Sequence, residues 1–164
     1  MKTLLILRHA KSSWKDMLLA DHDRPLKKRG KRDAPIMGKL LREQGLVPDL
    51  ILSSTAKRAL KTAVLVADAC GYDGEINVQR EFYPGYPDAY IEALKETPDE
   101  YQIVMVVGHN PGLEELLELL TEAAEFLPTA ALAQVALPLD YWVELNDETS
   151  GELVNLWLPR ALKD

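Results

Sequence analysis

The stretch Thr3-Leu4-Leu5-Ile6-Leu7-Arg8-His9 opens with a run of apolar residues that ends abruptly in two polar ones. An unbroken run rich in leucine and isoleucine predicts a strand that is buried on both faces of a parallel sheet. Similar short apolar runs lie at residues 49–53 and 102–107. The chain therefore contains three predicted buried strands, and the polar residues that follow them are candidates for a site.

A polar segment and a helix separate the first two predicted strands. Residues 12–30 are polar and irregular, which predicts a long surface loop, and long ordered loops are often functional. Apolar residues then recur at helical spacing over residues 36–41, with Gly45 as the expected stop. Pro35 is compatible with this helix only near its start, because proline lacks the N–H that an interior position donates.

The second predicted strand also leads into a helix. We expect this helix over residues 56–70, with Ser54 or Thr55 as its cap and Gly71 at its end. Residues 75–79 then resemble a short strand. Strand and helix therefore alternate along the chain, as they do in α/β proteins.

The same alternation continues to the end of the chain. Residues 88–95 predict a helix, and Asn110-Pro111 is a cap-then-first-turn signal for a helix with a stripe of leucines. Residues 133–137 and 152–158 predict two strands that extend the sheet in an antiparallel sense. The expected fold is α/β, with a mostly parallel central sheet flanked by helices on both faces, and residues 1–164 are expected to form a single domain.

Composition narrows the class of protein. With 164 residues the chain is long enough to bury a core, and a formal charge of -7 argues against a general nucleic-acid binder. A single cysteine, Cys70, leaves no internal disulfide and is expected to be a small buried apolar residue. The first residues lack a signal-peptide pattern, and no apolar stretch approaches a membrane span. We therefore expect a cytoplasmic protein with no nucleic-acid or membrane partner; the oligomeric state stays open.

Phosphate-capable side chains follow each of the three predicted strands. Arg8-His9 follows the first, residues 53–58 the second and His109 the third. Open α/β sheets bind ligands outside the carboxyl ends of their strands, so these side chains are expected to meet. Arg58 adds a hint, because a cation in the first turn of a helix is disfavoured by the helix dipole unless an anion is bound.

Two arginines and two histidines suit a phosphoryl-transfer pocket. The planar fork of Arg8 can hold two phosphate oxygens at once. A neutral imidazole such as that of His9 can attack phosphorus directly, since its ordinary pKa of about 6.5 leaves a bare nitrogen near neutrality. The arginines and His109 would stabilise charge on the phosphoryl oxygens during transfer. The sequence predicts no metal site, because its histidines lack a regular spacing, and we expect no cofactor.

Three segments together resemble the histidine phosphatase superfamily, also called the phosphoglycerate mutase-like family. They are Leu7-Arg8-His9-Ala10-Lys11-Ser12, Ser53-Ser54-Thr55-Ala56-Lys57-Arg58 and Gly108-His109-Asn110-Pro111-Gly112. The short chain, the segment Arg24-Pro25-Leu26 with Gly30 after it, and Arg-His-Ala in place of the commoner Arg-His-Gly make it most similar to the SixA-type phosphohistidine phosphatases. The resemblance implies a phosphoglycerate mutase-like fold.

The resemblance also implies roles for individual residues. Arg8 and Arg58 would hold phosphate, His9 would be phosphorylated, and His109 would stabilise the transferring group. The superfamily supplies a general acid from a glutamate between the second arginine and the second histidine, and Glu81 is the best-placed candidate; a solvated loop carboxylate is the equal alternative. An imidazole leaving from a P–N bond needs this proton much less than an alkoxide does.

The polar loop holds further candidates. Arg24 either binds phosphate or pairs with Asp21 or Asp23, and His22 is expected to be an exposed polar residue. Residues 24–32 include six basic residues in nine positions, which either attract an acidic phosphoprotein or form a solvated basic face.

The leading functional hypothesis is hydrolysis of phosphohistidine in a protein through an intermediate on His9. A small-molecule phosphomonoesterase of the same superfamily is the nearest alternative, and a mutase has less support because no insertion for holding phosphoglycerate is apparent. A phosphate-binding module without turnover is the third alternative. The partner protein cannot be read from the sequence.

Overall fold

The computed structural model describes residues 1–162, and its centre is a six-stranded sheet in the order β3-β2-β4-β1-β5-β6. The strands are β1 (Lys2–Arg8), β2 (Leu50–Ser54), β3 (Ile76–Gln79), β4 (Ile103–Gly108), β5 (Leu132–Leu137) and β6 (Glu152–Trp157). The first four strands are parallel, β5 runs antiparallel to β1, and β6 runs antiparallel to β5 with a bulge between Gln134 and Val135. This is the mostly parallel α/β sheet that the apolar runs predict.

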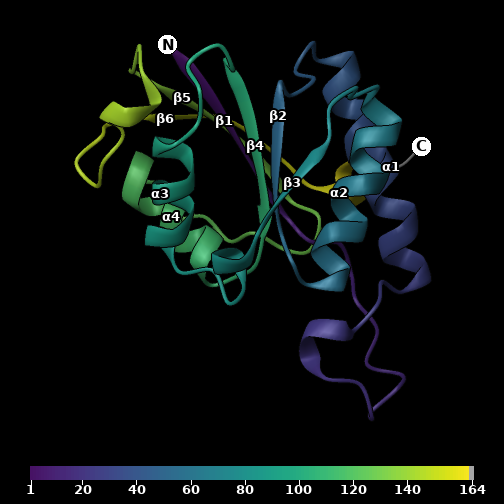
Figure 1. Cartoon of the computed structure of the whole chain (residues 1–164). Coiled ribbons are helices and arrows are strands. Elements are labelled where there is room, and N and C mark those ends of the chain that lie inside the picture. The colour runs from purple at the N-terminus through teal and green to yellow at the C-terminus, as the bar shows by residue number, and fades with distance from the viewer. Residues whose placement is uncertain (163–164) are drawn as a thin grey trace.

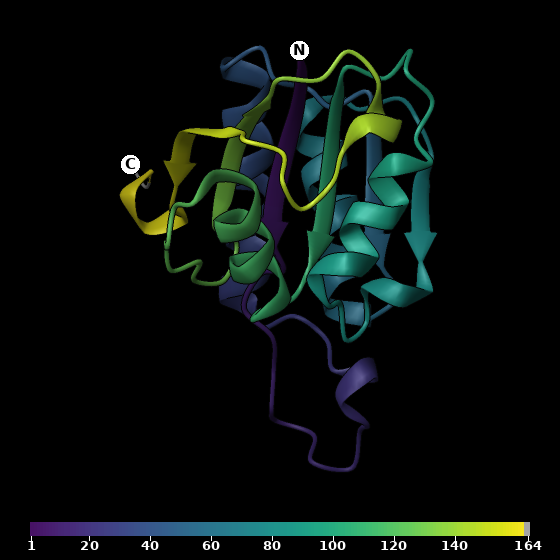
Figure 2. The same cartoon turned by 90° about the vertical axis from the view of Figure 1, so that its left-hand side faces the viewer.

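Helices cover both faces of the sheet (Figures 1 and 2). The helices are α1 (Lys28–Glu43), α2 (Lys57–Cys70), α3 (Pro87–Lys95) and α4 (Gly112–Thr121). The pair α1 and α2 lies on one face, and the pair α3 and α4 lies on the other. The described residues also contain four 3-10 turns: η1 (Asp21–Asp23), η2 (Arg80–Phe82), η3 (Trp142–Glu144) and η4 (Pro159–Ala161). None of the helices among the described residues is long and apolar enough to cross a bilayer.

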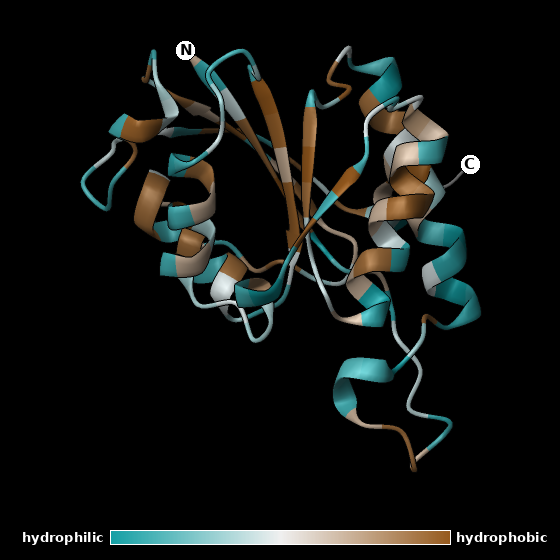
Figure 3. Ribbon diagram, in the orientation of Figure 1, coloured by the Kyte–Doolittle hydropathy of each residue, from teal (hydrophilic) through white to brown (hydrophobic). Residues whose placement is uncertain are grey.

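Each face of the sheet buries its own apolar cluster. Alternate residues of β1 point to opposite faces, so Leu4 and Ile6 join the cluster under α3 and α4, and Leu5 and Leu7 join the one under α1 and α2. The central strands are apolar along most of their length (Figure 3), because both of their faces are covered.

The segment between β1 and α1 projects from the body of the molecule (Figures 1 and 2). A single bridge between Ser12 and Leu26 closes its base, and its tip exposes Met17 (92%) and Leu18 (97%). Gly30 packs against this base so closely that a Cβ there would lie 2.2 Å from the Lys11 carbonyl oxygen. The expected loop over residues 12–30 is thus confirmed as far as its last residues, which already belong to α1.

The expected position of Pro35 near a helix start is wrong. The helix begins at Lys28, seven residues earlier, and Pro35 lies inside it. The predicted start was too late because residues 28–33 are mostly charged, and a polar run next to a loop carries no apolar periodicity.

The expected side-chain caps of two helices are also absent. Ala56 and Pro111 occupy the cap positions of α2 and α4, and neither helix has a side-chain cap. The Ser54 hydroxyl lies two residues before the cap position, where it accepts the Ala56 N–H at 3.1 Å and also bonds His109, and Asn110 donates to the Leu127 carbonyl oxygen. The side chains of Ser54 and Asn110 therefore form hydrogen bonds near the carboxyl ends of β2 and β4.

Candidate active site

The carboxyl ends of three adjacent strands form one pocket, as the sequence predicts. Strands β2, β4 and β1 are neighbours in the sheet, and Arg8 of β1 stands opposite Gly108 of β4. The pocket has a volume of about 240 Å³. Its lining consists of Arg8, His9, Lys11, Ser12, Trp14, Arg24, Arg58, His109, Asn110 and Thr129. No carboxylate is among these residues, so the pocket suits an anion.

His9 is held rigidly, with one ring nitrogen left free. Its backbone N–H donates to the Gly108 carbonyl oxygen at 3.1 Å, and the Ala10 N–H donates to the Thr62 hydroxyl at 3.0 Å. The Nδ1 of His9 lies 2.8 Å from the Ala10 carbonyl oxygen, which can only accept, so Nδ1 carries the proton. The Nε2 of His9 is therefore unprotonated. Burial lowers the pKa of His9 to about 3, which keeps the ring neutral near pH 7.

His109 lies beside His9, with 5.2 Å between the ring centroids. Its Nε2 is 2.8 Å from the Ser54 hydroxyl oxygen, whereas its buried Nδ1 has no hydrogen-bond partner among the described residues. Burial, together with the nearby Arg58 charge, lowers the pKa of His109 to about 4. A buried nitrogen without a partner is costly, so Nδ1 of His109 is suited to a ligand.

The glycine before His109 allows this close arrangement. A Cβ at Gly108 would lie 2.1 Å from the hydroxyl oxygen of Tyr90, a buried residue of α3. The same hydroxyl accepts the backbone N–H of His109 at 3.2 Å. Tyr90 thus fixes the start of the turn from β4 to α4, and only glycine leaves room for it.

Arg8 and Arg58 both line the pocket, as predicted. Arg8 donates from Nη1 to the Leu127 carbonyl oxygen at 3.0 Å, and its buried Nε has no partner among the described residues. Arg58 is anchored from the projecting loop: Nη1 donates to the Asp21 carbonyl oxygen at 2.6 Å and Nη2 to the Asp21 carboxylate at 3.0 Å. Each guanidinium is oriented by the protein and retains N–H groups for an anion.

Arg24 lines the pocket and also forms an ion pair with Asp21, so both roles that the sequence leaves open for it are compatible with the structure. Its Nη1 donates to the Asp21 carboxylate at 2.9 Å, Nη2 donates to the Ser12 hydroxyl, and the Trp14 ring stacks on the guanidinium at 3.3 Å. Burial alone would raise the pKa of Asp21, but hydrogen bonds from Tyr83, Arg58 and Arg24 lower it to about 2. Asp21 thus joins both arginines to the loop.

His22 and Glu81 are the two candidate residues that do not line the pocket. His22 is more enclosed than expected: Nε2 lies 2.8 Å from the Thr55 hydroxyl, and its ring meets Tyr83 edge-on at 4.8 Å. Glu81 is exposed on η2 and is not part of the pocket lining; it lines a second cavity with Tyr83 and Tyr86. Tyr83 connects the two regions, because its ring meets that of His109 edge-on at 5.5 Å.

Sequence reasoning missed the contacts that the loop makes with the rest of the site. The ion pair between Asp21 and Arg58 and the stacking of Trp14 on Arg24 both depend on how the loop folds back. Asp21 was considered only as a partner of Arg24. The one available signal was the density of Asp, His and Arg in residues 21–24.

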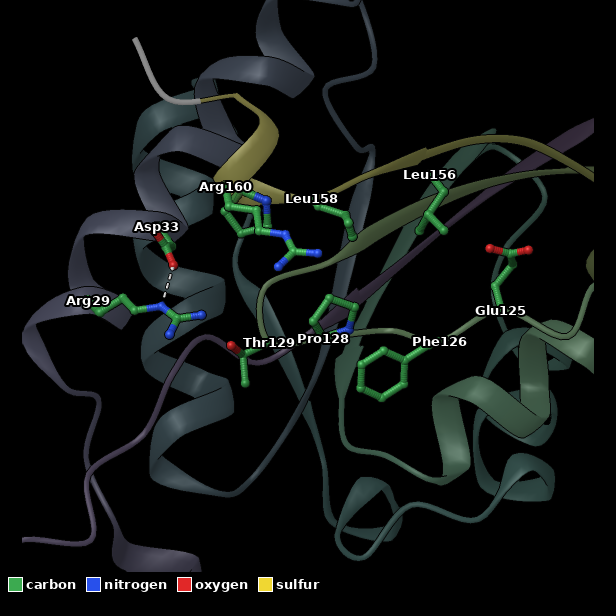
Figure 4. Close-up of a pocket in the computed structure, with 10 residues that line it drawn as sticks. Arg29, Asp33, Glu125, Phe126, Pro128, Thr129, Leu156, Leu158 and Arg160 are labelled. Carbon is green, nitrogen blue, oxygen red and sulfur yellow. Dashed lines mark ion pairs between the residues drawn. The ribbon is translucent and has the colours of Figure 1, made fainter.

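A larger cavity of about 590 Å³ adjoins the pocket and shares Thr129 with it. Figure 4 shows Arg29 and Arg160 reaching toward this cavity, and Phe126, Leu156 and Leu158 on its apolar walls. The buried Asp33 carboxylate holds the Nε of Arg29 at 3.6 Å. With Glu125 on the far side, the cavity carries balanced charges, in contrast to the cationic pocket beside it.

Comparisons with known proteins identify the family of the chain. The family model of the histidine phosphatase superfamily (branch 1) matches residues 4–83. An uncharacterized chloroplastic protein of Arabidopsis thaliana is 37% identical over 147 residues, which cover 81% of this chain and 66% of that protein.

Solved structures extend the similarity over nearly the whole chain. SixA from Agrobacterium tumefaciens is 30% identical with a TM-score of 0.79, and the alignment covers 96% of this chain and 99% of that one. The protein histidine phosphatase SixA complexed with tungstate shares the fold, with 24% identity, a TM-score of 0.84 and coverage of 98% and 99%. The chain is SixA-like and belongs to the histidine phosphatase superfamily.

Proposed function

We propose that this phosphatase hydrolyses phosphohistidine in a partner protein, through a phosphohistidine intermediate on His9. The observation that carries the proposal is the state of the His9 ring: Nδ1 donates to the Ala10 carbonyl oxygen, so the bare nucleophilic nitrogen is Nε2. Burial lowers the pKa of His9 to about 3, and the ring is therefore ready to attack without first losing a proton.

The reaction has two displacement steps. The Nε2 lone pair of His9 attacks phosphorus while the P–N bond to the substrate imidazole breaks; the electron pair leaves with that nitrogen, and the imidazole leaves neutral because its other ring nitrogen carries a proton. Water then attacks the phosphorus on His9, the P–Nε2 bond breaks, its electron pair returns to Nε2, and the protons of the water leave with the phosphate product. Arg8 and Arg58 hold the phosphoryl oxygens, Arg24 adds a third cation, and Nδ1 of His109 donates to the charge that develops.

The choice of an N-phosphate rests on the absence of an acid among the residues that line the pocket. No carboxylate is part of that lining, and Glu81 lies on η2 by a different cavity. An alkoxide leaving group requires a proton donor, whereas a neutral imidazole leaves readily without one. The pocket therefore favours phosphohistidine over phosphate esters, and the small-molecule phosphomonoesterase is the weaker alternative.

Trapping the intermediate tests the proposal. After rapid mixing with a phosphohistidine peptide and an alkaline quench, intact-protein mass spectrometry should show one added phosphoryl group, mapped to His9. The variant His9→Ala should carry none and release no phosphate. His22→Ala is the matched control, since it removes a nearby histidine outside the pocket lining and should still be phosphorylated on His9. Phosphate binding by a wild-type protein that never carries the added group would identify a binding module without turnover.

Glu81 separates the two substrate classes. For Glu81→Gln we expect unchanged hydrolysis of phosphohistidine peptides, because this exposed side chain lies outside the pocket lining. If Glu81 is the acid for esters, the same variant should lose most of any activity toward p-nitrophenyl phosphate, by roughly a hundredfold. Brisk ester hydrolysis with no phosphate released from phosphohistidine would instead identify a phosphomonoesterase.

A further inference from the structure

A cationic groove lies on the surface between α1 and α2. It is lined by Lys31, Lys57 and Lys61, with Leu26, Leu60 and Val64 as its apolar part, and has a volume of about 460 Å³. We call it the lysine groove. No carboxylate contributes to this lining. The charge of the groove is therefore uncompensated, in a chain whose formal charge is -7.

The lysines of this groove are not engaged elsewhere. The side chains of all three are exposed, and none forms an ion pair with another described residue. Lys57 is also the first residue of α2, where the positive end of the helix dipole adds to its charge. Like charges this close repel one another, and an anionic occupant would relieve that repulsion.

The linings of the lysine groove and of the pocket around His9 contain residues that are neighbours in the chain at two places. Arg24 lines the pocket and Pro25 lines the groove, and in the same way Arg58 lines the pocket and Lys57 the groove. Consecutive Cα atoms are about 3.8 Å apart, so a few residues of extended chain would reach from one site to the other. A segment next to a phosphorylated histidine could thus lie in the groove while the histidine enters the pocket.

We propose that the lysine groove is the docking site for an acidic segment of the phosphoprotein substrate. This inference rests on the proposed function for its substrate, and on charge complementarity for the nature of the segment. Aspartate or glutamate side chains would pair with Lys31, Lys57 and Lys61, and one or two apolar side chains would cover Leu60 and Val64. The groove thereby selects among phosphohistidine proteins, while the arginines bind the phosphoryl group that all of them carry.

The docking site is tested by comparing the hydrolysis of two synthetic phosphohistidine peptides of equal length. One peptide is rich in glutamate, and the other has glutamine at the same positions. The wild type should hydrolyse the glutamate peptide with kcat/KM about tenfold higher, through a lower KM. The difference should shrink as salt rises, because exposed charges are screened. Phosphoramidate, a small N-phosphate that cannot reach the groove, should be hydrolysed independently of these effects.

The double variant Lys31→Glu/Lys61→Glu should lose the preference for the glutamate peptide and keep its rate with phosphoramidate. Lys57 is left intact because it precedes Arg58. The control Lys39→Glu/Arg42→Glu changes net charge equally at exposed positions of α1 outside the groove, and should keep the preference. Equal kcat/KM for both peptides, or an equal loss in the control, would overturn the docking site and support a solvated basic face.

A binding measurement separates this proposal from the proposed function. Fluorescence anisotropy with the unphosphorylated glutamate and glutamine peptides needs no turnover, and it should show tighter binding of the glutamate peptide to the wild type but not to Lys31→Glu/Lys61→Glu. Hydrolysis of phosphoramidate without peptide preference would refute the groove alone. Selective binding with no hydrolysis of any N-phosphate would refute the proposed function and retain the groove as an acidic-peptide site.

Discussion

The Ser54 hydroxyl is placed to select which nitrogen of His109 carries the ring proton. Its oxygen accepts the Ala56 N–H at 3.1 Å, and we expect its single proton to be donated to the Nε2 of His109, 2.8 Å away. When Nε2 accepts, the ring proton must lie on Nδ1, which is the nitrogen without a partner among the described residues. Ser54 is thus a positioning residue for the proposed role of His109.

Replacing Ser54 with alanine should therefore impair turnover through His109. We expect Ser54→Ala to lower kcat roughly ten- to hundredfold, the equivalent of one lost buried hydrogen bond, with a smaller effect on KM. Ser54→Thr keeps the hydroxyl and should restore most of the activity. Nitrogen NMR shifts of His109 should report a proton on Nδ1 in the wild type and a mixture of tautomers in Ser54→Ala. The same tautomer in both proteins would argue against this role.

At the scale of residues, the sequence predicts most of the pocket. Arg8, His9, Arg58 and His109 were expected together because they follow adjacent buried strands, and the structure does bring them together. The pairing of Asp21 with Arg58 could not be predicted, because it depends on the path of a loop with no periodic pattern. Glu81 was expected from family resemblance alone, and its role stays a prediction.

At the scale of elements, the close packing of the base of the projecting loop against α1 depends on Gly30. A Cβ there would lie 2.2 Å from the Lys11 carbonyl oxygen and 3.0 Å from the Lys11 nitrogen, and backbone cannot yield as a flexible side chain does. Gly30→Ala should therefore lower the free energy of unfolding by about 1–3 kcal/mol, although alanine favours helices elsewhere.

The same substitution should also disturb the pocket, because Lys11, Ser12 and Arg24 all line it from the base of this loop. Urea unfolding and the dissociation constant for inorganic phosphate would measure the two effects. Lys28→Ala, at an exposed position in the same helix turn, is the control and should change neither. A Gly30→Ala protein with wild-type stability would show that the loop base can shift at little cost.

The predicted elements differ from the observed ones mainly at helix starts. The strands were found to within about two residues, since buried runs end where polar residues begin. The start of α1 was missed because its first turns are charged and lie beside a polar loop. The cap positions of α2 and α4 are Ala56 and Pro111 instead of the expected residues: Ser54 bonds both the Ala56 N–H and His109 from outside the helix, and the Asn110 side chain bonds Leu127.

At the scale of the whole molecule, the two buried histidines couple stability to pH. Burial lowers the pKa of His9 to about 3 and of His109 to about 4, against about 6.5 in an unfolded chain. Below about pH 6.5 both histidines become protonated in the unfolded chain, whereas in the folded protein they stay neutral. The contribution to stability is therefore complete above about pH 6.5 and is lost as the pH falls through the folded pKa values, about 4 for His109 and about 3 for His9.

Chemical unfolding at two pH values measures this coupling. Between pH 7 and pH 5 we expect each histidine to contribute a loss on the order of 1–2 kcal/mol in the free energy of unfolding. The variant His9→Asn removes one titrating ring and should show a smaller decrease than the wild type over this range. An identical decrease in both proteins would mean that His9 titrates normally in the folded state.

The two edges of the sheet have a consequence for how the protein behaves in crowded solution. An exposed strand edge offers unpaired N–H and C=O groups, and these can recruit a strand from another molecule into an aggregate. One edge here is β3, which is only four residues long, and the other is β6, where the bulge beside Gln134 and Val135 breaks the regular ladder. Short and bulged edges are poor templates for such recruitment. The architecture that places the pocket-forming strands β2, β4 and β1 in the interior of the sheet thus also leaves short and bulged strands at its margins, where self-association would begin.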